Sequence, residues 1–451
     1  MASSSSSPMS VNGDGNYSVI TVASLKETVN GTEWLLDPSA GNESFCIFRV
    51  PKCLVDVNKN TYGPHIVSIG PYHHGEKHLE MMQQHKRRFL RDLLAQTPPT
   101  GPGLDDYQQA VALREEEIRG CYSESTLKFC KDQLVDMMLL DGLFIIELLC
   151  KIGGLSKTPI GDDPIFHFAS VFTYLIRDLL RLENQIPFFV LQTLFNASRD
   201  SRHASDSSLA ELALQLFESA VEIPYGDHDQ GKHLLDLLRL SFIHPSMRLK
   251  EINLGFTSSS VQIIQSAKKL HLAGIKFKAR HAQNEAMSFL DIRFSNGVLE
   301  IPLITLDDLC TDLLLNFIAF EQCYSHSPRH ITTYAAFMSC LVRSPTDAAF
   351  LCEHDIIEKY IATDEEVANF FRNMGKDVPF DIGQSYLLEL FKDVNEYQRN
   401  MWHVRWAGFR LKYFDTPWSF LSALAAVILL LFTAIQTFFA VYAYVLPPKD
   451  E

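Results

Sequence analysis

Acidic side chains inside apolar stretches are the residues of this sequence best suited to chemistry. Asp141 and Glu147 lie in QLVDMMLLDGLFIIELL, and Glu183 lies in LLRLENQIPFFVL. Burial raises the pKa of a carboxyl group, and such a group can act as a general acid or base. A buried carboxylate can equally be neutralised by a cation, and we expect Arg177 and Arg181 on the neighbouring apolar segment to be the partners. We favour this structural ion-pair network, in which removing one partner unfolds the domain.

A histidine cluster between residues 65 and 85 is the second candidate for chemistry. His74 and His78 are four residues apart, which is the spacing of two zinc ligands on one helix face. Gly75 interrupts that segment, and no Glu stands where a metalloprotease places its base, so we predict no metal site. Ser68 lacks the preceding Gly of a nucleophile elbow, and the sequence contains no phosphate-binding or kinase motif. We therefore predict no catalytic residues and no cofactor.

The composition favours a large folded chain in a reducing compartment. The 451 residues are 47% apolar, too many for a disordered protein, and the net charge of −14 does not fit a nucleic-acid binder. The nine cysteines are scattered and never spaced as Cys-x-x-Cys, whereas a disulfide-stapled secreted domain is smaller and denser in cysteine. We predict reduced, mostly buried thiols.

The C-terminal segment over residues 417–446 is uncharged and almost wholly apolar. About 20 apolar residues cross a bilayer as a helix, so we predict one transmembrane helix there, followed by a short tail over residues 447–451. Trp418 at one end and Tyr442 and Tyr444 at the other are placed as interfacial anchors.

The charges that flank this segment predict its orientation. Four basic residues precede it: Arg399, Arg405, Arg410 and Lys412. Because positive flanks stay in the cytoplasm and no secretory signal is present, we predict a cytoplasmic domain, tail-anchored in the plasma membrane or an endomembrane. The opposite topology stays open, because N-x-S/T triplets begin at Asn16, Asn30, Asn42 and Asn196 and would be glycosylation sites on the outside.

The stretch over residues 386–414 that leads into the apolar segment carries apolar residues at helical spacing. Arg399, His403 and Arg410 fall on one side of such a helix. One interpretation is a basic helix that rests on anionic lipid. The other is a helix that packs against the core and exposes a polar face, and we weigh the two equally.

The rest of the chain is predicted to be one domain. Residues 1–44 are polar and Ser-rich, which favours a disordered tail, and residues 45–414 form a mainly helical soluble domain with loops at 97–106, 196–208 and 225–231. Apolar residues at i, i+3 and i+4 predict helices over 79–96, 127–152, 165–182, 209–222, 261–273, 306–323 and 330–343.

A β-hairpin is predicted over residues 288–304. The sequence SFLDIRFSNGVLEIPLI alternates across Asn296–Gly297, which is the strongest short hairpin signal, and GIKFK at 274–278 is a candidate for a third strand. We therefore predict a mainly α fold, which is one large helical domain with a small antiparallel β-hairpin or sheet, plus one C-terminal transmembrane helix.

Several long motifs, in order, resemble those of the plant family that carries domain of unknown function 247, also called uncharacterised protein family 0481. The resemblance covers about residues 46–446. The motifs are CIFRVPKCLVDVNKNTYGPHIVSIGPYHHGEKHLEMMQQHKRRFL, LLDGLFIIELL, LLRLENQIPFFVL, IPLITLDDLCTDLLLNFIAFEQC and YQRNMWHVRWAGFRLKYFDTPWSFLSALAA.

The resemblance implies a helical domain with one C-terminal span, found mostly in land plants, with no established activity, cofactor or catalytic residues. Some grass members are implicated as male determinants in self-incompatibility, so a recognition or signalling role is expected by analogy. We predict a membrane-anchored interaction or signalling component, not an enzyme. Its predicted partners are the lipid bilayer and unidentified proteins, with no nucleic acid.

The alternative is a membrane-associated hydrolase or transferase that uses Asp141, Glu147, Glu183 or the histidine cluster. It requires several of these side chains to converge on one water-accessible cleft.

Overall fold

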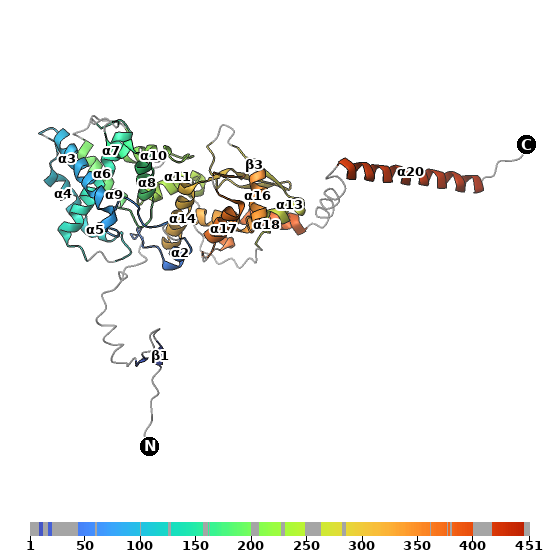
Figure 1. Cartoon of the computed structure of the whole chain (residues 1–451), viewed down its shortest axis with the longest axis horizontal. Helices are drawn as coiled ribbons and strands as arrows, with labels where there is room; N and C mark the ends of the chain where they lie inside the picture. The colour runs from blue at the N-terminus through green and yellow to red at the C-terminus, as the bar shows by residue number, and fades with distance from the viewer. Residues whose placement is uncertain are drawn as a thin grey trace, which may run out of the picture.

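The computed structural model of the chain shows a helical body and one long helix, α20 (Pro417–Val445), that stands apart from it (Figure 1). The structure describes residues 9–11, 17–19 and 44–445, apart from gaps at 59–60, 100, 125–127, 157–160, 162, 200–206, 227–230, 249–262, 282–285, 361, 377, 379–380 and 400–416. The prediction of a mainly helical body with a small sheet and a long apolar C-terminal helix is confirmed.

The first half of the body is helical and is built around α6 (Lys131–Ile152). Its other helices are α2 (Lys52–Val57), η1 (Lys77–Leu79), α3 (Glu80–Gln96), α4 (Leu104–Ala112), α5 (Glu115–Arg119), α7 (Pro164–His167), α8 (Ala169–Leu179), α9 (Phe188–Arg199) and α10 (Leu209–Glu218). Helix α6 contacts α3, α4, α9 and α10, and its residues are buried nearly all round from Leu134 onward, as its continuous apolar sequence requires. A Cβ at Gly142 would lie 2.5 Å from Leu194 Cδ1, so the glycine allows α9 to approach α6 closely.

The second half mixes helices with short strands. Its elements are α11 (Leu234–Ser241), α12 (Pro245–Arg248), α13 (Ala267–Leu272), β3 (Lys276–Arg280), β4 (Arg293–Ser295), β5 (Val298–Pro302), β6 (Ile304–Leu306), α14 (Asp308–Cys323), α15 (His330–Leu341), α16 (Pro345–Glu353), β7 (Ile357–Lys359), α17 (Asp364–Met374), η3 (Ile382–Gln384) and α18 (Leu388–Arg399).

The predicted hairpin is present, but the sheet is mixed. Strands β4 and β5 pair in antiparallel fashion around Asn296 and Gly297, whose φ angles of 50° and 74° are those of a tight hairpin turn. The predicted third strand is β3, and it pairs with β5 in parallel. The expectation of a purely antiparallel sheet is therefore wrong, because the chain crosses over between β3 and β4 and returns to the far side of β5.

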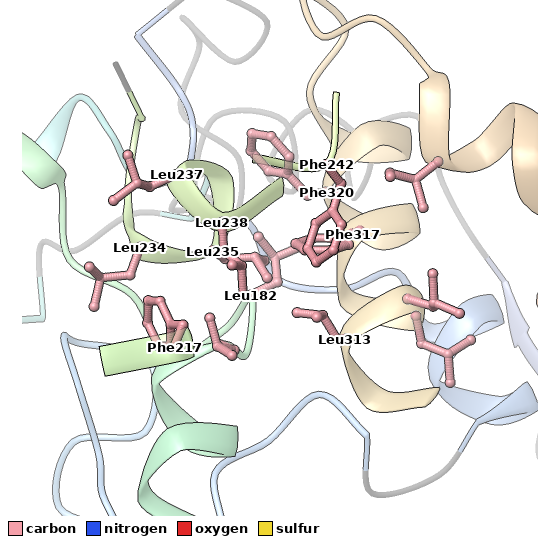
Figure 2. Packing of buried hydrophobic residues seen from close by; sticks show 14 of the residues in the cluster. Leu182, Phe217, Leu234, Leu235, Leu237, Leu238, Phe242, Leu313, Phe317 and Phe320 are labelled. Carbon is pink, nitrogen blue, oxygen red and sulfur yellow. The ribbon is translucent and has the colours of Figure 1, made fainter. Parts of the chain in front are cut away.

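Helices α11 and α14 join the two halves of the body through an apolar core. Figure 2 shows Leu235 and Leu238 of α11 between Phe217 of α10 and the aromatic residues Phe317 and Phe320 of α14. The buried apolar residues form one cluster that runs from Cys46 to Val394 within the described part of the chain. One continuous core therefore positions the polar residues of both halves.

Two predictions of local structure need correction. The helix predicted over 165–182 is broken at Phe168 into α7 and α8. It ends at Leu179, because Gln185 Nε2 donates to the carbonyl oxygens of Leu179 (2.7 Å) and Arg181 (2.8 Å) in place of a further helical turn. Within the tail predicted to be disordered, Met9–Val11 and Tyr17–Val19 pair as antiparallel strands on either side of the sequence Asn-Gly-Asp-Gly-Asn.

Candidate functional site

The buried loop, which we define as residues 61–73, lacks helix or strand and takes its hydrogen-bond partners from side chains. Asp178, at the end of α8 and fully buried, accepts hydrogen bonds from three successive amides. The N–H groups of His65, Ile66 and Val67 lie 2.7–3.0 Å from its carboxylate oxygens. A backbone N–H removed from water must find a partner, so Asp178 satisfies this part of the loop as a neighbouring strand would.

Asn184 and Gln185 extend the same arrangement. Asn184 Oδ1 accepts from Ile69 N–H at 2.7 Å, while its Nδ2 donates to Val67 O at 3.0 Å. Gln185 Oε1 accepts from Leu235 N–H at 3.3 Å and so connects this segment to α11. Side chains of the motif LENQIP thus form hydrogen bonds with the backbone of the loop and of α11.

Asp141 of α6 holds the loop from the opposite side together with Lys86 of α3. Asp141 Oδ2 accepts from Gly70 N–H at 2.8 Å, and Lys86 Nζ donates to Asp141 Oδ1 at 2.5 Å and to Ser68 O. Gly70 has φ +73°, and a Cβ there would lie 2.5 Å from Gln185 O, so only glycine fits. Lys86 has no exposed surface, and the ion pair compensates two buried charges.

Arg181 and Arg177 connect the loop to α14. Arg181 donates to Thr61 O, and its Nη2 lies 3.3 Å from Asp312 Oδ2, while Arg177 Nη2 donates to the same oxygen at 2.6 Å. Burial lowers the pKa of Arg181, whereas the contact with Asp312 outweighs burial and raises the pKa of Arg177. Asn316 Nδ2 also donates to Thr61 O at 3.2 Å. Helix α14 therefore contacts the start of the loop directly through Asn316, and indirectly through Asp312, which pairs with Arg181.

Glu183 binds the segment that precedes the loop. Its Oε1 accepts from Val50 N–H at 2.8 Å, and its Oε2 lies 2.9 Å from Arg49 Nη1 and 3.1 Å from His73 Nε2. The other ring nitrogen of His73 faces Glu76 Oε1 at 2.7 Å. Burial alone would raise the pKa of Glu183, but the hydrogen bonds from His73 and Val50 and the charge of Arg49 hold it below its ordinary value.

The predicted pairing of Arg177 and Arg181 with the acids of the apolar motifs is wrong. The two arginines turn toward α14 and Asp178, whereas Asp141 faces α3 and Glu183 faces Arg49. Sequence proximity misled the assignment, because the true partners come from elements more than 50 residues away or from the same helical turn.

The acids named in the enzyme alternative have different partners. Asp141 binds Lys86, Glu183 binds Arg49, and Glu147 accepts from Ser156 Oγ at 2.6 Å. Among the residues that the structure describes, no three His, Cys, Asp or Glu side chains are grouped as metal ligands. In the described structure, Asp141 and Glu183 therefore accept hydrogen bonds from backbone amides, and Glu147 accepts from a serine hydroxyl.

The role of Lys86 was missed from the sequence, although a signal exists. Met82, Lys86, Phe89 and Leu93 are the buried residues of α3, so the lysine occupies an apolar position of the helical stripe. A cation at such a position predicts a buried acid opposite it, and Asp141 is that acid.

His233 and Arg239 of the α11 region were also missed. His233 is fully buried at the N-cap of α11, where its Nδ1 accepts from Asp236 N–H at 3.2 Å and its Nε2 donates to Cys46 O at 3.0 Å. This pattern requires the neutral ring, and burial lowers the pKa of His233 to about 4. Arg239 pairs with Asp236 and Glu321, and no local sequence pattern indicates this pairing.

The predicted membrane-proximal residues are placed only in part. Arg399 is exposed at the end of α18, while Arg405, Arg410 and Lys412 lie outside the described residues, as do the side chains of Trp418 and Tyr444. Tyr442 is 55% exposed on α20.

Helix α18 packs on the body as one of the two interpretations requires. Its residues Leu390, Phe391 and Val394 are buried, and the Tyr397 ring lies edge-on to Phe294 of β4 at 5.9 Å. The span Leu424–Tyr442 of α20 has a mean hydropathy of 2.4 and no residue buried by the body, and it is long and apolar enough to cross a membrane.

Comparison with known proteins gives a family and no activity. A family profile described as "Plant protein of unknown function" (DUF247) matches residues 47–432. The UPF0481 protein At3g47200 of Arabidopsis thaliana is 40% identical over 92% of this chain and 90% of its own length. The putative UPF0481 protein At3g02645 of the same plant is 25% identical over 88% of this chain and 90% of its own length. No solved structure matches the chain.

Proposed function

This chain belongs to the plant family of unknown function DUF247, and from that premise we propose that it is a single-pass membrane protein whose helical body serves recognition or signalling. The observation that carries the proposal is α20. Its 19-residue apolar window has no residue buried by the body, so in water this surface would remain exposed. Insertion into a bilayer removes the free-energy cost of exposing this apolar surface to water, since each buried CH2 group contributes about 0.8 kcal/mol.

The recognition part of the proposal is supported by what the buried acids do. Asp141, Asp178 and Glu183 stabilise the buried loop and its flanks, which keeps the fold of the body, and so the arrangement of its exposed side chains, fixed. The grass members implicated in self-incompatibility provide the analogy. We place the body in the cytoplasm, because the residues before α20 are basic.

Alkaline carbonate extraction of membranes that contain the full-length protein tests the anchor. We expect the wild-type chain to remain in the pellet, and the double variant Leu431→Arg with Ile435→Arg to be extracted, because each arginine near the helix centre costs about 2.5–3.5 kcal/mol. The matched control Leu421→Arg with Ser422→Arg adds the same charges at the helix end, where arginine reaches the interface, and remains in the pellet. Extraction of the wild-type chain would contradict the anchor.

Chemical cross-linking in native plant membranes tests the recognition role. We expect a covalent adduct of defined mass that survives replacement of α20 by an unrelated transmembrane helix, because the body carries the contact. Loss of the adduct on replacement would place recognition in the span, and no adduct in either form would contradict a recognition role.

A further inference from the structure

Two buried cysteines lie close together where the start of the body meets the chain that follows α5. Ile47 N–H donates to Cys121 O at 2.9 Å and Ser123 N–H donates to Ile47 O at 2.9 Å, so Ile47 and Tyr122 form a parallel bridge. The residues that precede the two bridge partners, Cys46 and Cys121, are in direct contact through their backbones, because Cys121 O accepts from the N–H groups of both Cys46 and Ile47.

The close approach of Cys46 and Cys121 is supported by further observations. Cys46 N–H donates to Cys121 O at 3.0 Å, and the two residues are 2% and 6% exposed. A hydrogen bond with the Cys121 thiol, reinforced by burial, raises the pKa of Cys46. The direct backbone hydrogen bond brings the two residues to the close approach that a disulfide needs, a Cα separation of about 4.4–6.8 Å.

We propose that Cys46 and Cys121 form a disulfide when the chain folds in the presence of a small-molecule disulfide such as glutathione disulfide. The thiolate of one cysteine attacks a sulfur of glutathione disulfide and releases one glutathione thiolate. The thiolate of the second cysteine then attacks the protein sulfur of the mixed disulfide, forms the Cys46–Cys121 bond and releases the second glutathione. The two cysteine protons end on the two glutathione thiols, so two protein thiols are oxidised and one glutathione disulfide is reduced.

The bond is formed during folding and not afterwards. A buried thiol with a raised pKa is almost never the reactive thiolate, so the native pair exchanges slowly. The cytoplasmic glutathione pool keeps such a pair reduced, whereas an oxidising compartment closes it. The inference is therefore independent of the proposed function, and the state of the pair records the compartment in which the body folded.

Refolding of the full-length protein in detergent tests the proposal. The urea-unfolded, reduced chain is refolded with glutathione and glutathione disulfide, free thiols are alkylated, and the linkages are mapped by non-reducing peptide mass spectrometry. We expect the Cys46–Cys121 peptide pair to be the main intramolecular cross-link. We also expect the oxidised protein to melt several degrees above protein refolded with reductant, because the bond restricts the unfolded chain.

The variants Cys46→Ser and Cys121→Ser lose the cross-link and the shift in Tm, whereas Cys130→Ser, which removes a nearby exposed thiol, keeps both. The proposal is overturned if folded wild-type protein carries Cys46 and Cys121 alkylated, bound to glutathione or linked to other cysteines. The disulfide map of the wild-type protein tests the Cys46–Cys121 bond even if a serine variant does not fold.

Discussion

The carboxylate of Asp178 shows what single buried side chains do in this protein. It accepts hydrogen bonds from three consecutive loop amides. Asn184 and Asp141 accept from two further loop amides, and Glu183 accepts from Val50 N–H in the segment that precedes the loop. Each unmade hydrogen bond of this kind costs about 1–3 kcal/mol, so the loop depends on every one of these residues.

Replacing Lys86 by methionine leaves Asp141 charged and buried without its cation. We expect the free energy of unfolding to fall by about 3–5 kcal/mol, because an uncompensated buried charge is far more costly than a lost surface pair. Urea denaturation of the full-length protein in detergent measures the change.

The control for this variant is Arg87→Met, which removes an exposed cation from the same helix and changes stability by less than about 0.5 kcal/mol. Adding Asp141→Asn to Lys86→Met should recover part of the loss, since the amide oxygen still accepts from Gly70 N–H. Equal stability of wild type and Lys86→Met would contradict the role assigned to this ion pair.

Protonation of His233 should destabilise the native body below neutral pH. Burial holds the pKa of His233 at about 4, against an ordinary value of 6.5, so between these values the unfolded chain binds a proton that the native chain excludes. The contribution of His233 to the free energy of unfolding therefore falls by roughly 3 kcal/mol as pH drops from 6.5 to 4. Denaturation midpoints at a series of pH values measure this slope.

The variant His233→Asn isolates the effect, because Asn is a good N-cap that does not titrate. We expect a smaller slope between pH 4 and 6.5 than in wild type. His244→Asn is the control, since exposed His244 also accepts a backbone hydrogen bond through Nδ1. An unchanged slope in His233→Asn would mean that this ring is not the group excluded from protonation.

Individual elements differ in how far the sequence determines them. The apolar helix α20 and the Asn296–Gly297 hairpin follow from local patterns, namely an uncharged run of about 20 residues and a turn that needs two positive φ angles. The direction of β3 does not, because GIKFK pairs equally well either way and only the path of the intervening chain selects parallel pairing. The end of α8 at Leu179 also has a cause outside helix periodicity, because the side chain of Gln185 donates to Leu179 O.

Gly297 of the hairpin turn allows Tyr397 of α18 to pack closely against the turn. Its φ is +74°, and a Cβ would lie 2.5–2.9 Å from the Tyr397 ring of α18. We expect Gly297→Ala to displace Tyr397 and to increase amide hydrogen exchange over residues 388–399 by about tenfold or more, since the opening free energy of that helix falls by about 1.4 kcal/mol or more.

The control variant Gly154→Ala distinguishes the effect of the steric clash with Tyr397 from the effect of backbone strain. Gly154 has φ +70° with no atom within 4 Å of the added Cβ, so this variant carries the strain without the clash. Exchange in α18 should remain at the wild-type rate. If both alanine variants leave α18 unchanged, the contact with Gly297 does not hold the helix.

At the scale of the whole molecule, the sequence predicts the division into body and apolar helix but not the internal assembly. Composition and periodicity identify buried acids such as Asp141 and Glu183. Their partners, Lys86 and Arg49, are 55 and 134 residues away, and no local pattern carries that information. The roles of Arg405, Arg410 and Lys412 stay predictions, because these residues lie outside the described part of the chain.

Protease treatment of sealed vesicles tests the orientation that we propose. A cytoplasmic body is digested from outside, and a protected fragment of about 30 residues that contains α20 remains. Detergent, which opens the vesicles, is the control for protease activity on the whole chain.

A glycan at Asn196 would contradict this orientation. The side chain is exposed on α9, but the hydroxyl of Ser198 in the same triplet is buried and donates to Phe195 O at 2.8 Å. Full protection of the body together with this glycan would place it on the outside.

The hydrogen bond from Asn316 to Thr61 joins residues that are 255 positions apart. A ribosome that adds about 5–20 residues per second needs roughly 13–51 s to synthesise the intervening chain. During that time the carbonyl oxygen of Thr61 lacks its partner on α14, while apolar segments such as residues 134–149 have already been synthesised. The buried loop therefore reaches its complete set of hydrogen bonds only after α14 has been synthesised.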